Sequence, residues 1–248
     1  MRNIKQYEKS YLEQYDFERF QVRFRRRKVL ELLQNYCHRQ ILEIGCGAEP
    51  LFEFVNDFDE FTVVEPSELF YQNALEKATL RKNIRCIHGL FEQSLSIINN
   101  QVFDYIIVSC LLHELEKPIT FLKEVKKVCH SDTVVHINVP NANSFHRLLA
   151  VESGMISSIY DSSQRNMNLQ QNRVYDIESL VHDISLSAQI EILEKGSYFI
   201  KPLSHNQMMK CLQYGVFTEK VLDGLYNLSH FMPDFGSEIY INFKFLAD

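Results

Sequence analysis

Two glycines spaced two residues apart form the part of the sequence best suited to hold a ligand. The stretch ILEIGCGAEP opens with an apolar run, 41–44, typical of a buried strand, and Gly45 and Gly47 follow it. A glycine turn between a strand and a helix lets a ligand approach the backbone closely, because no Cβ is in the way. Glu65, twenty residues after Gly45, can accept hydrogen bonds from both ribose hydroxyls. The spacing therefore predicts a nucleoside site.

The nucleoside can belong to NAD or to S-adenosylmethionine, and the sequence favours the second. A pyrophosphate-binding fingerprint needs a third glycine, but the chain has Pro50 at that position. S-Adenosylmethionine contains no pyrophosphate and does not need that glycine. Glu43 lies on the same side of its strand as Gly45 and can reach toward the turn. An NAD-dependent oxidoreductase and a protein that binds the cofactor without turnover stay as alternatives.

Alternating strands and helices position this turn. Apolar runs predict strands at 41–44, 61–65, 83–89, 102–109, 133–140, 190–200 and 238–245. Helical spacing predicts helices over 3–37, from 67 to about 78, from 118 to about 128, over 177–185 and within 203–231. We expect the last strand to be half-exposed and antiparallel, at or near the sheet edge, with a bulge in the preceding strand at Gly196.

The chain of 248 residues reads as a single domain. We divide it into an N-terminal helical cover (1–37), a cofactor-binding core (38–142), an acceptor-side elaboration (143–235) and a final strand (237–246). The absence of a long apolar run and of a signal-like N-terminus predicts a cytoplasmic protein without membrane contact. A net charge of −6 argues against nucleic acid as a partner, and we interpret the basic run 23–28 as a solvated helix face.

The set of motifs over residues 38–145 resembles a class I S-adenosylmethionine-dependent methyltransferase of the group that acts on small molecules. The matching elements are ExGxG at 43–47, the acid at the end of the second strand, and LLHELEKP at 111–118. The resemblance implies a doubly wound, mostly parallel seven-stranded sheet, Rossmann-like, with an antiparallel strand near the C-terminus. It also implies cofactor contacts at Glu43, Gly45, Cys46, Gly47, Glu65, Pro66, Gly89, Leu90, Phe91, Ser109, Cys110 and Leu111. His88 departs from the acid common in the family at the end of the third strand.

The reaction that this resemblance implies needs alignment and, for a hydroxyl or amine acceptor, a base. Two histidines follow strand ends that open on the ligand face, so His146 and then His113 are the candidate bases. We expect the rate to rise with pH near the histidine reference of about 6.5. The cysteine and histidine spacing predicts no metal site.

Other polar side chains extend the candidate site. Tyr11 and Arg23 are candidates to touch the carboxylate of the cofactor. A polar, aromatic acceptor pocket would suit a sugar or another polar metabolite. Its candidate residues are Asn141, Asn143, Tyr160, Tyr198, His205 and Tyr240.

Overall fold

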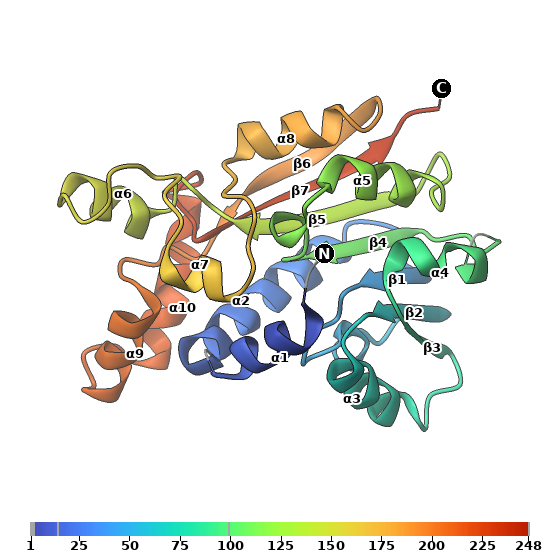
Figure 1. Ribbon diagram of the computed structural model, residues 1–248, viewed down its shortest axis with the longest axis horizontal. Coiled ribbons are helices and arrows are strands. Elements are labelled where there is room, and N and C mark those ends of the chain that lie inside the picture. The colour runs from blue at the N-terminus through green and yellow to red at the C-terminus, as the bar shows by residue number, and fades with distance from the viewer. Residues whose placement is uncertain (1–2, 14, 99, 248) are drawn as a thin grey trace.

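The computed structural model describes residues 3–13, 15–98 and 100–247, which build a seven-stranded sheet (Figure 1). The strands lie in the order β3-β2-β1-β4-β5-β7-β6, with bounds β1 Gln40–Ile44, β2 Glu60–Glu65, β3 Ile84–His88, β4 Tyr105–Ser109, β5 Val134–Pro140, β6 Ile190–Tyr198 and β7 Glu238–Phe245. The first five strands pair in parallel, while β7 is antiparallel to β5 and β6. The predicted fold class is confirmed.

Helices cover both faces of this sheet. On one face, Leu42 and Ile106 share a core with three helices, α4 Phe91–Ile98, α5 Pro118–Lys126 and α8 Ile177–Ser185. On the other face, Ile41 and Phe61 pack against α2 Tyr15–Leu33 and α3 Glu68–Ala78. Neighbouring strand residues point to opposite faces, so residues 41 and 42 belong to different cores. Burial on both faces explains the near-continuous apolar runs of the central strands.

The N-terminal cover consists of two helices, α1 Ile4–Glu13 and α2. Residues 1, 2 and 14, which belong to the predicted cover and helix, lie outside the described residues. Helix α2 packs beside α9 His205–Gln213 and near α10 Glu219–Asn227, at the end of the sheet that also carries α6 (Figure 1). Stacked rings hold α2 in place, with the Phe24 centroid 4.4 Å from that of Phe199, which follows β6, and 5.4 Å from that of Tyr226 on α10. The resulting aromatic core is separate from both cores of the sheet.

The segment 141–175 has more regular structure than its Asn- and Ser-rich sequence indicated. It contains α6 Phe145–Glu152 and α7 Gln164–Asn168. Ser163 caps α7 by accepting from the Asn166 N–H, and the Asn166 side chain bonds back to the Ser163 backbone. Helices this short owe little to intrinsic propensity, so the amphipathic pattern gave no clear signal for them.

Two expectations about the C-terminal strands were wrong. Strand β7 is antiparallel and lies next to the edge strand β6, as expected, but it is mostly buried instead of half-exposed. On its polar face, Asn242 accepts from the Tyr105 hydroxyl at 3.2 Å. The irregularity in β6 lies between Ile192 and Glu194 instead of at Gly196. Gly196 pairs with Tyr240, and a Cβ there would lie 3.1 Å from the tyrosine oxygen, so the glycine admits this ring.

The basic run 23–28 is also not a solvated face throughout. The Arg25 side chain is only 15% exposed. Arg26 pairs with Glu49, and its guanidinium lies 3.8 Å from the Phe54 ring centroid. Arg27 and Lys28 both pair with Glu31. One side of α2 therefore directs positive charge into the molecule.

Candidate active site

A cavity of about 1510 Å³ opens at the carboxyl ends of the parallel strands. Small-molecule sites typically occupy about 300–1,000 Å³, so this one has room for more than one ligand. All of the predicted site residues line it: Glu43, Gly45, Cys46, Gly47, Glu65, Pro66, Gly89, Leu90, Phe91, Ser109, Cys110, Leu111, His113 and His146. The cavity extends from the glycine turn to the beginning of α9, and α1, α2, α6 and α7 contribute to its walls.

The glycine turn has the backbone conformation that its residue types require. Gly45 and Gly47 have φ angles of 80° and 58°, in the left-handed region that favours glycine. The Gly45 N–H donates to the Val64 carbonyl at 2.9 Å, which ties the turn to the end of β2. A Cβ built on Gly47 would meet nothing within 4 Å. This glycine thus leaves an open cradle on the cavity wall.

Glu65 lies at the end of β2 with its carboxylate held by two main-chain donors. Its Oε2 accepts from the Gly47 N–H at 3.1 Å, and its Oε1 accepts from the Ser67 N–H at 2.8 Å. The Ser67 hydroxyl in turn caps α3 by accepting from the Phe70 N–H. The acid is therefore fixed beside the turn, facing the space that a nucleoside would fill.

Glu43 takes a structural position beside the same turn. Its side chain is buried, and Oε2 accepts from the Leu51 N–H at 3.0 Å. Burial, reinforced by the nearby Glu65 carboxylate, raises the pKa of Glu43 to about 8. At neutral pH Glu43 is therefore mostly protonated, and it anchors the chain that follows the turn.

The end of β3 supplies an apolar wall. Gly89 has a φ of 150°, Leu90 is partly exposed, and Phe91 is buried in the core under α4. His88 also lines the cavity, but its Nδ1 lies 3.2 Å from a Glu68 carboxylate oxygen and its ring is stacked on Tyr71 at 4.9 Å. Its departure from the family acid thus coincides with a side chain engaged on α3.

The end of β4 is held in an unusual conformation. Cys110 has a φ of 49°, which is uncommon for a residue other than glycine. Its N–H donates to both the Asn138 carbonyl (2.9 Å) and the Asn138 Oδ1 (3.0 Å). The Asn138 amide donates to the Tyr198 hydroxyl at 2.7 Å. Three strands, β4, β5 and β6, thereby fix the backbone at Ser109 to Leu111.

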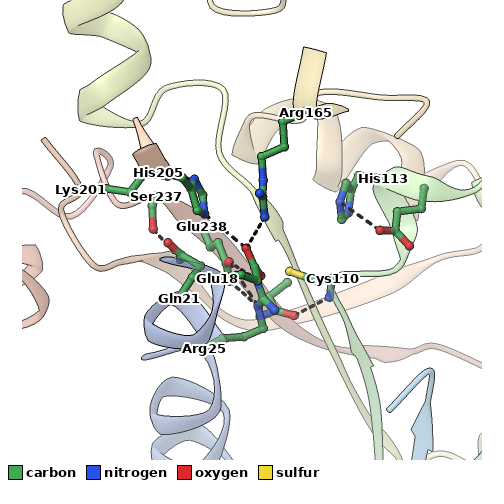
Figure 2. Close-up of polar contacts among 12 residues, drawn as sticks. Glu18, Gln21, Arg25, Cys110, His113, Arg165, Lys201, His205, Ser237 and Glu238 are labelled. Carbon is green, nitrogen blue, oxygen red and sulfur yellow. Dashed lines mark hydrogen bonds and ion pairs between the residues drawn. The ribbon is translucent and has the colours of Figure 1, made fainter. Parts of the chain in front are cut away.

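A buried ionic cluster, which the sequence analysis did not identify, lies at the other end of the cavity (Figure 2). Arg25 donates from Nε to both Glu238 carboxylate oxygens, at 3.2 and 3.0 Å, and from Nη2 to Glu18 at 3.1 Å. Arg165 donates to the other Glu18 oxygen at 2.8 Å, and His205 Nε2 lies 3.3 Å from it. We define these five residues as the ionic cluster.

Electrostatics keep the central acid of the cluster ionised. Burial alone would raise the pKa of Glu18, but His205, Arg25 and Arg165 together hold it well below its ordinary value. One signal for the cluster was present in the sequence, since Glu18 and Arg25 are seven residues apart and share a helix face. Their partners from α7, α9 and β7 lie more than 130 residues away.

The two candidate bases occupy different environments. His146 is half-buried in α6, and its Nδ1 has no hydrogen-bond partner among the described residues. Burial, then the positive charge of Lys201, holds the pKa of His146 well below its ordinary value. His113 is 2% exposed and lies beside Glu114, and its carbonyl accepts from the Asn172 and Arg173 N–H groups. His146 is thus the more accessible of the two.

Of the remaining candidate residues, some line the cavity and others do not. Tyr11 lines the cavity, whereas Arg23 pairs with Glu219 on α10 and does not line it. In the predicted acceptor pocket, only Asn141 and His205 line the cavity. Asn143, Tyr160, Tyr198 and Tyr240 do not contribute to the wall. Tyr160 bonds Asp176 at the surface, and Tyr198 is buried against Glu238.

Two absences concern only the part of the chain that the structure describes. There, no three His, Cys, Asp or Glu side chains converge as a metal site would require. Within the same residues, no helix combines the length and the apolar composition needed to cross a bilayer.

Comparisons with known proteins agree with this architecture. Residues 42–137 match a family model described as "Methyltransferase domain", while no curated protein sequence matches the chain. Similar solved structures include the N-methyltransferase NodS from Bradyrhizobium japonicum in complex with S-adenosyl-l-homocysteine: 15% identity, TM-score 0.56, 93% of this chain and 88% of that chain. The plantazolicin methyltransferase BamL is 13% identical, with TM-score 0.57, covering 98% and 97%. The [4+2]-cyclase SpnF is 14% identical, with TM-score 0.55, covering 85% and 76%.

The residues at the glycine turn fit the cofactor of such a domain. The open side of Gly47 leaves space at the backbone, and the fixed carboxylate of Glu65 faces that space with acceptor oxygens. Position 50 holds a buried proline where a pyrophosphate site would have glycine. Residues 42–137 therefore match a methyltransferase domain, and the glycine turn within them fits S-adenosylmethionine as the cofactor.

Proposed function

We propose that this protein transfers a methyl group from S-adenosylmethionine to a hydroxyl or amine of a small polar molecule, such as a sugar. The observation that carries the proposal is the pairing of the open glycine turn with Glu65 at one end of a cavity that continues well beyond it. The proposal includes the domain division predicted from the sequence, in which residues 143–235 cover the acceptor. Reaction in the cytoplasm stays a prediction.

The cofactor-side residues divide the work of binding. In this proposal the turn 45–47 contacts the methionine part, Glu65 accepts from the ribose hydroxyls, and 89–91 line the adenine. When bound, the cofactor supplies an electrophilic sulfonium methyl group. The backbone at Ser109 to Leu111, fixed by its bonds to Asn138, orients the acceptor toward that group. Such alignment can supply several kcal/mol of the rate enhancement.

His146 takes the proton of the acceptor, and His113 is the second candidate. A bound cofactor would supply its methyl group to the acceptor oxygen or nitrogen, and His146 would hold the proton that the acceptor loses. Since the pKa of His146 lies below its ordinary value, the ring is neutral and ready to accept a proton across the neutral range. The rise in rate expected near the histidine reference of about 6.5 therefore moves to lower pH.

Transfer of a labelled methyl group from the cofactor tests the proposal. We expect incubation of the protein with metabolite extract and labelled S-adenosylmethionine to give a product heavier than its precursor by about 14 Da, apart from the label. Turnover needs its own proof, because SpnF shows that proteins of this fold include a cyclase. Cofactor binding without any methylated product would favour a binding protein. Stabilisation by NAD and none by S-adenosylhomocysteine would instead favour an oxidoreductase.

A further inference from the structure

We propose that the acceptor end of the cavity binds an anionic group of the acceptor, a carboxylate or a phosphate, between Lys201 and Arg147. The assignment of this group to an acceptor rests on the proposed function, whereas the anion site stands on its own geometry. Both side chains line the cavity, near His146 and the ionic cluster.

The backbone places Lys201 inside the molecule. Two residues earlier, Phe199 has a φ of 60°, a conformation that costs about 1–3 kcal/mol for a residue other than glycine. Stacking on Phe24 and a hydrogen bond from the Ser237 N–H to the Phe199 carbonyl (2.8 Å) hold this bend. Lys201 is only 3% exposed as a result, although it borders the cavity.

Lys201 has a neutral partner in place of an acid. Its Nζ lies 3.1 Å from Nδ1 of His205. Burial, then the charge of Lys201, lowers the pKa of His205 to about 3, so the ring is neutral. With its Nε2 directed at Glu18, the ring presents its Nδ1 lone pair to the lysine. Among the described residues, no carboxylate lies within 4.0 Å of the Lys201 ammonium, which leaves donor capacity for a ligand.

Arg147 is a second cation whose contacts are not acids. Its Nε donates to the Ile159 carbonyl at 2.7 Å and its Nη2 to the Asp161 carbonyl at 2.5 Å. The Asp161 carboxylate is engaged elsewhere, since it accepts from the Ser157 and Ser158 N–H groups. In the described part of the chain, the Arg147 guanidinium forms no ion pair.

The charges around Lys201 leave a positive surplus. The groups that interact with it are Glu18 from α2, Arg165 from α7, Glu238 from β7, His146 and Arg147 from α6, and His205 from α9. The two acids already receive hydrogen bonds from Arg25 and Arg165. Lys201 and Arg147 therefore add positive charge that no side chain of the cluster balances, in a protein whose net charge is −6.

The pKa values of Lys201 and His146 are consistent with this surplus of positive charge. Burial, with contributions from Arg165 and Arg147, lowers the pKa of Lys201 to about 7 despite the nearby Glu18. Burial, Lys201 and Arg147 also depress the pKa of His146. A bound anion would favour the charged lysine and raise both pKa values. Anion binding would thus also make His146 a stronger base.

Calorimetric titration with simple anions tests the site without knowledge of the acceptor. We would titrate wild-type protein with inorganic phosphate, with succinate and with glucose as a neutral probe. The expected result is binding of phosphate or succinate and no binding of glucose, and the anion that binds identifies the chemical source. Titration at pH 8 in two buffers of different ionisation enthalpy should show uptake of a proton, because Lys201 becomes protonated on binding.

Three variants locate the effect. Lys201→Met should lower the affinity for the anion by roughly 10–100-fold and remove most of the proton uptake. Lys201→Arg keeps the positive charge and should retain binding. Lys210→Met removes the same charge from an exposed position on α9 and should leave binding unchanged. Unfolding curves of each variant show that it is folded.

Two outcomes would overturn the proposal: no anion binding to wild type, or equal binding to wild type and Lys201→Met. Titration of the same proteins with S-adenosylhomocysteine separates this proposal from the proposed function. Anion binding without binding of S-adenosylhomocysteine would refute the methyltransferase function alone. The reverse result would refute the anion site alone.

Discussion

The two ends of the cavity hold buried acids by different means. At the end nearest the glycine turn, the proposed cofactor end, Glu43 and Glu65 accept hydrogen bonds from main-chain N–H groups at Leu51, Gly47 and Ser67. At the opposite end, the proposed acceptor end, Glu18 is held by the side chains of two arginines. Main-chain donors come with the local turn, whereas side-chain donors must be brought from distant segments. The cofactor end is therefore a local structure, and the acceptor end depends on tertiary packing.

The contrast extends to the charge of the acids themselves. Glu43 and Glu18 are both buried, yet burial and a neighbouring acid raise the pKa of Glu43 to about 8. For Glu18, the hydrogen bond with His205 and the charges of Arg25 and Arg165 outweigh burial and hold the pKa well below its ordinary value. The partners decide the sign of the shift, so one acid is protonated at neutral pH and the other carries its charge.

The largest expected effect is the loss of stability on replacing Glu18. Glu18→Gln removes the negative charge that faces Arg25 and Arg165, and breaking a buried ion pair costs about 3–5 kcal/mol. Glu219→Gln is the matched control, because that acid pairs with Arg23 at the surface, where pairs contribute about 0–1 kcal/mol. Urea unfolding measures both. Equal losses in the two variants would show that the ionic cluster does not support the fold.

Glu43→Gln should act in the opposite direction. The folded-state pKa of Glu43 is raised from its ordinary value to about 8, so its stabilising contribution is complete below the unfolded value of about 4.3 and is lost as pH rises toward 8. Glutamine cannot ionise and still offers an oxygen to the Leu51 N–H. At pH 7 the variant should be more stable than wild type, on the order of 3 kcal/mol at about 1.4 kcal/mol per pKa unit.

The pH profile of that difference is the check. The advantage of Glu43→Gln should shrink toward zero as pH falls to about 4, because wild-type Glu43 is then protonated in both states. Glu18→Gln should show the reverse trend: the depressed pKa makes wild-type Glu18 stabilising above its unfolded value, and this stabilisation is lost as pH falls. Parallel profiles for the two variants would contradict the comparison.

A smaller effect should separate two glycines with similar backbones. Gly47 and Gly215 have φ angles of 58° and 71°, and a Cβ on either meets nothing within 4 Å, but only Gly47 lines the cavity. Alanine at either position should cost about 1–2 kcal/mol of stability from the left-handed conformation. Only Gly47→Ala should also weaken the binding of S-adenosylhomocysteine, by about 1–3 kcal/mol, because the added methyl group would overlap with the ligand. Calorimetry on both variants distinguishes them, and equal affinities would place the ligand away from the turn.

The sequence was most informative where structure is local. The turn at Gly45 and Gly47, the acid Glu65 and the order of strands and helices follow from periodicity and spacing over a few residues. The alternation of side chains along a strand is also a local property, and it places Ile41 and Leu42 in the two different cores of the sheet. Conformation and hydrogen-bond partners within the turn then needed only its immediate neighbours.

The acceptor end could not be derived in the same way. The polar residues of β7 read as exposed because nothing in the sequence shows that Asn242 meets Tyr105, 137 residues away. Tyr198 was placed in the pocket by its chemistry, but its hydroxyl is used to support Asn138. Nothing in the sequence indicated that Lys201 is buried, because its burial depends on the bend at Phe199 and on rings from α2. Each of these contacts is set by packing between distant segments.

Titration of S-adenosylhomocysteine into the wild type, Glu65→Ala and Glu60→Ala tests the central claim most directly. Glu60 begins the same strand at its exposed opposite end, so it is a matched control. The wild type and Glu60→Ala should bind with equal affinity. Glu65→Ala should lose about 1.5–3 kcal/mol, or roughly 10–150-fold, as expected for hydrogen bonds to a charged group. Unchanged affinity in Glu65→Ala, or no binding to the wild type, would contradict the assignment of this end of the cavity to the cofactor.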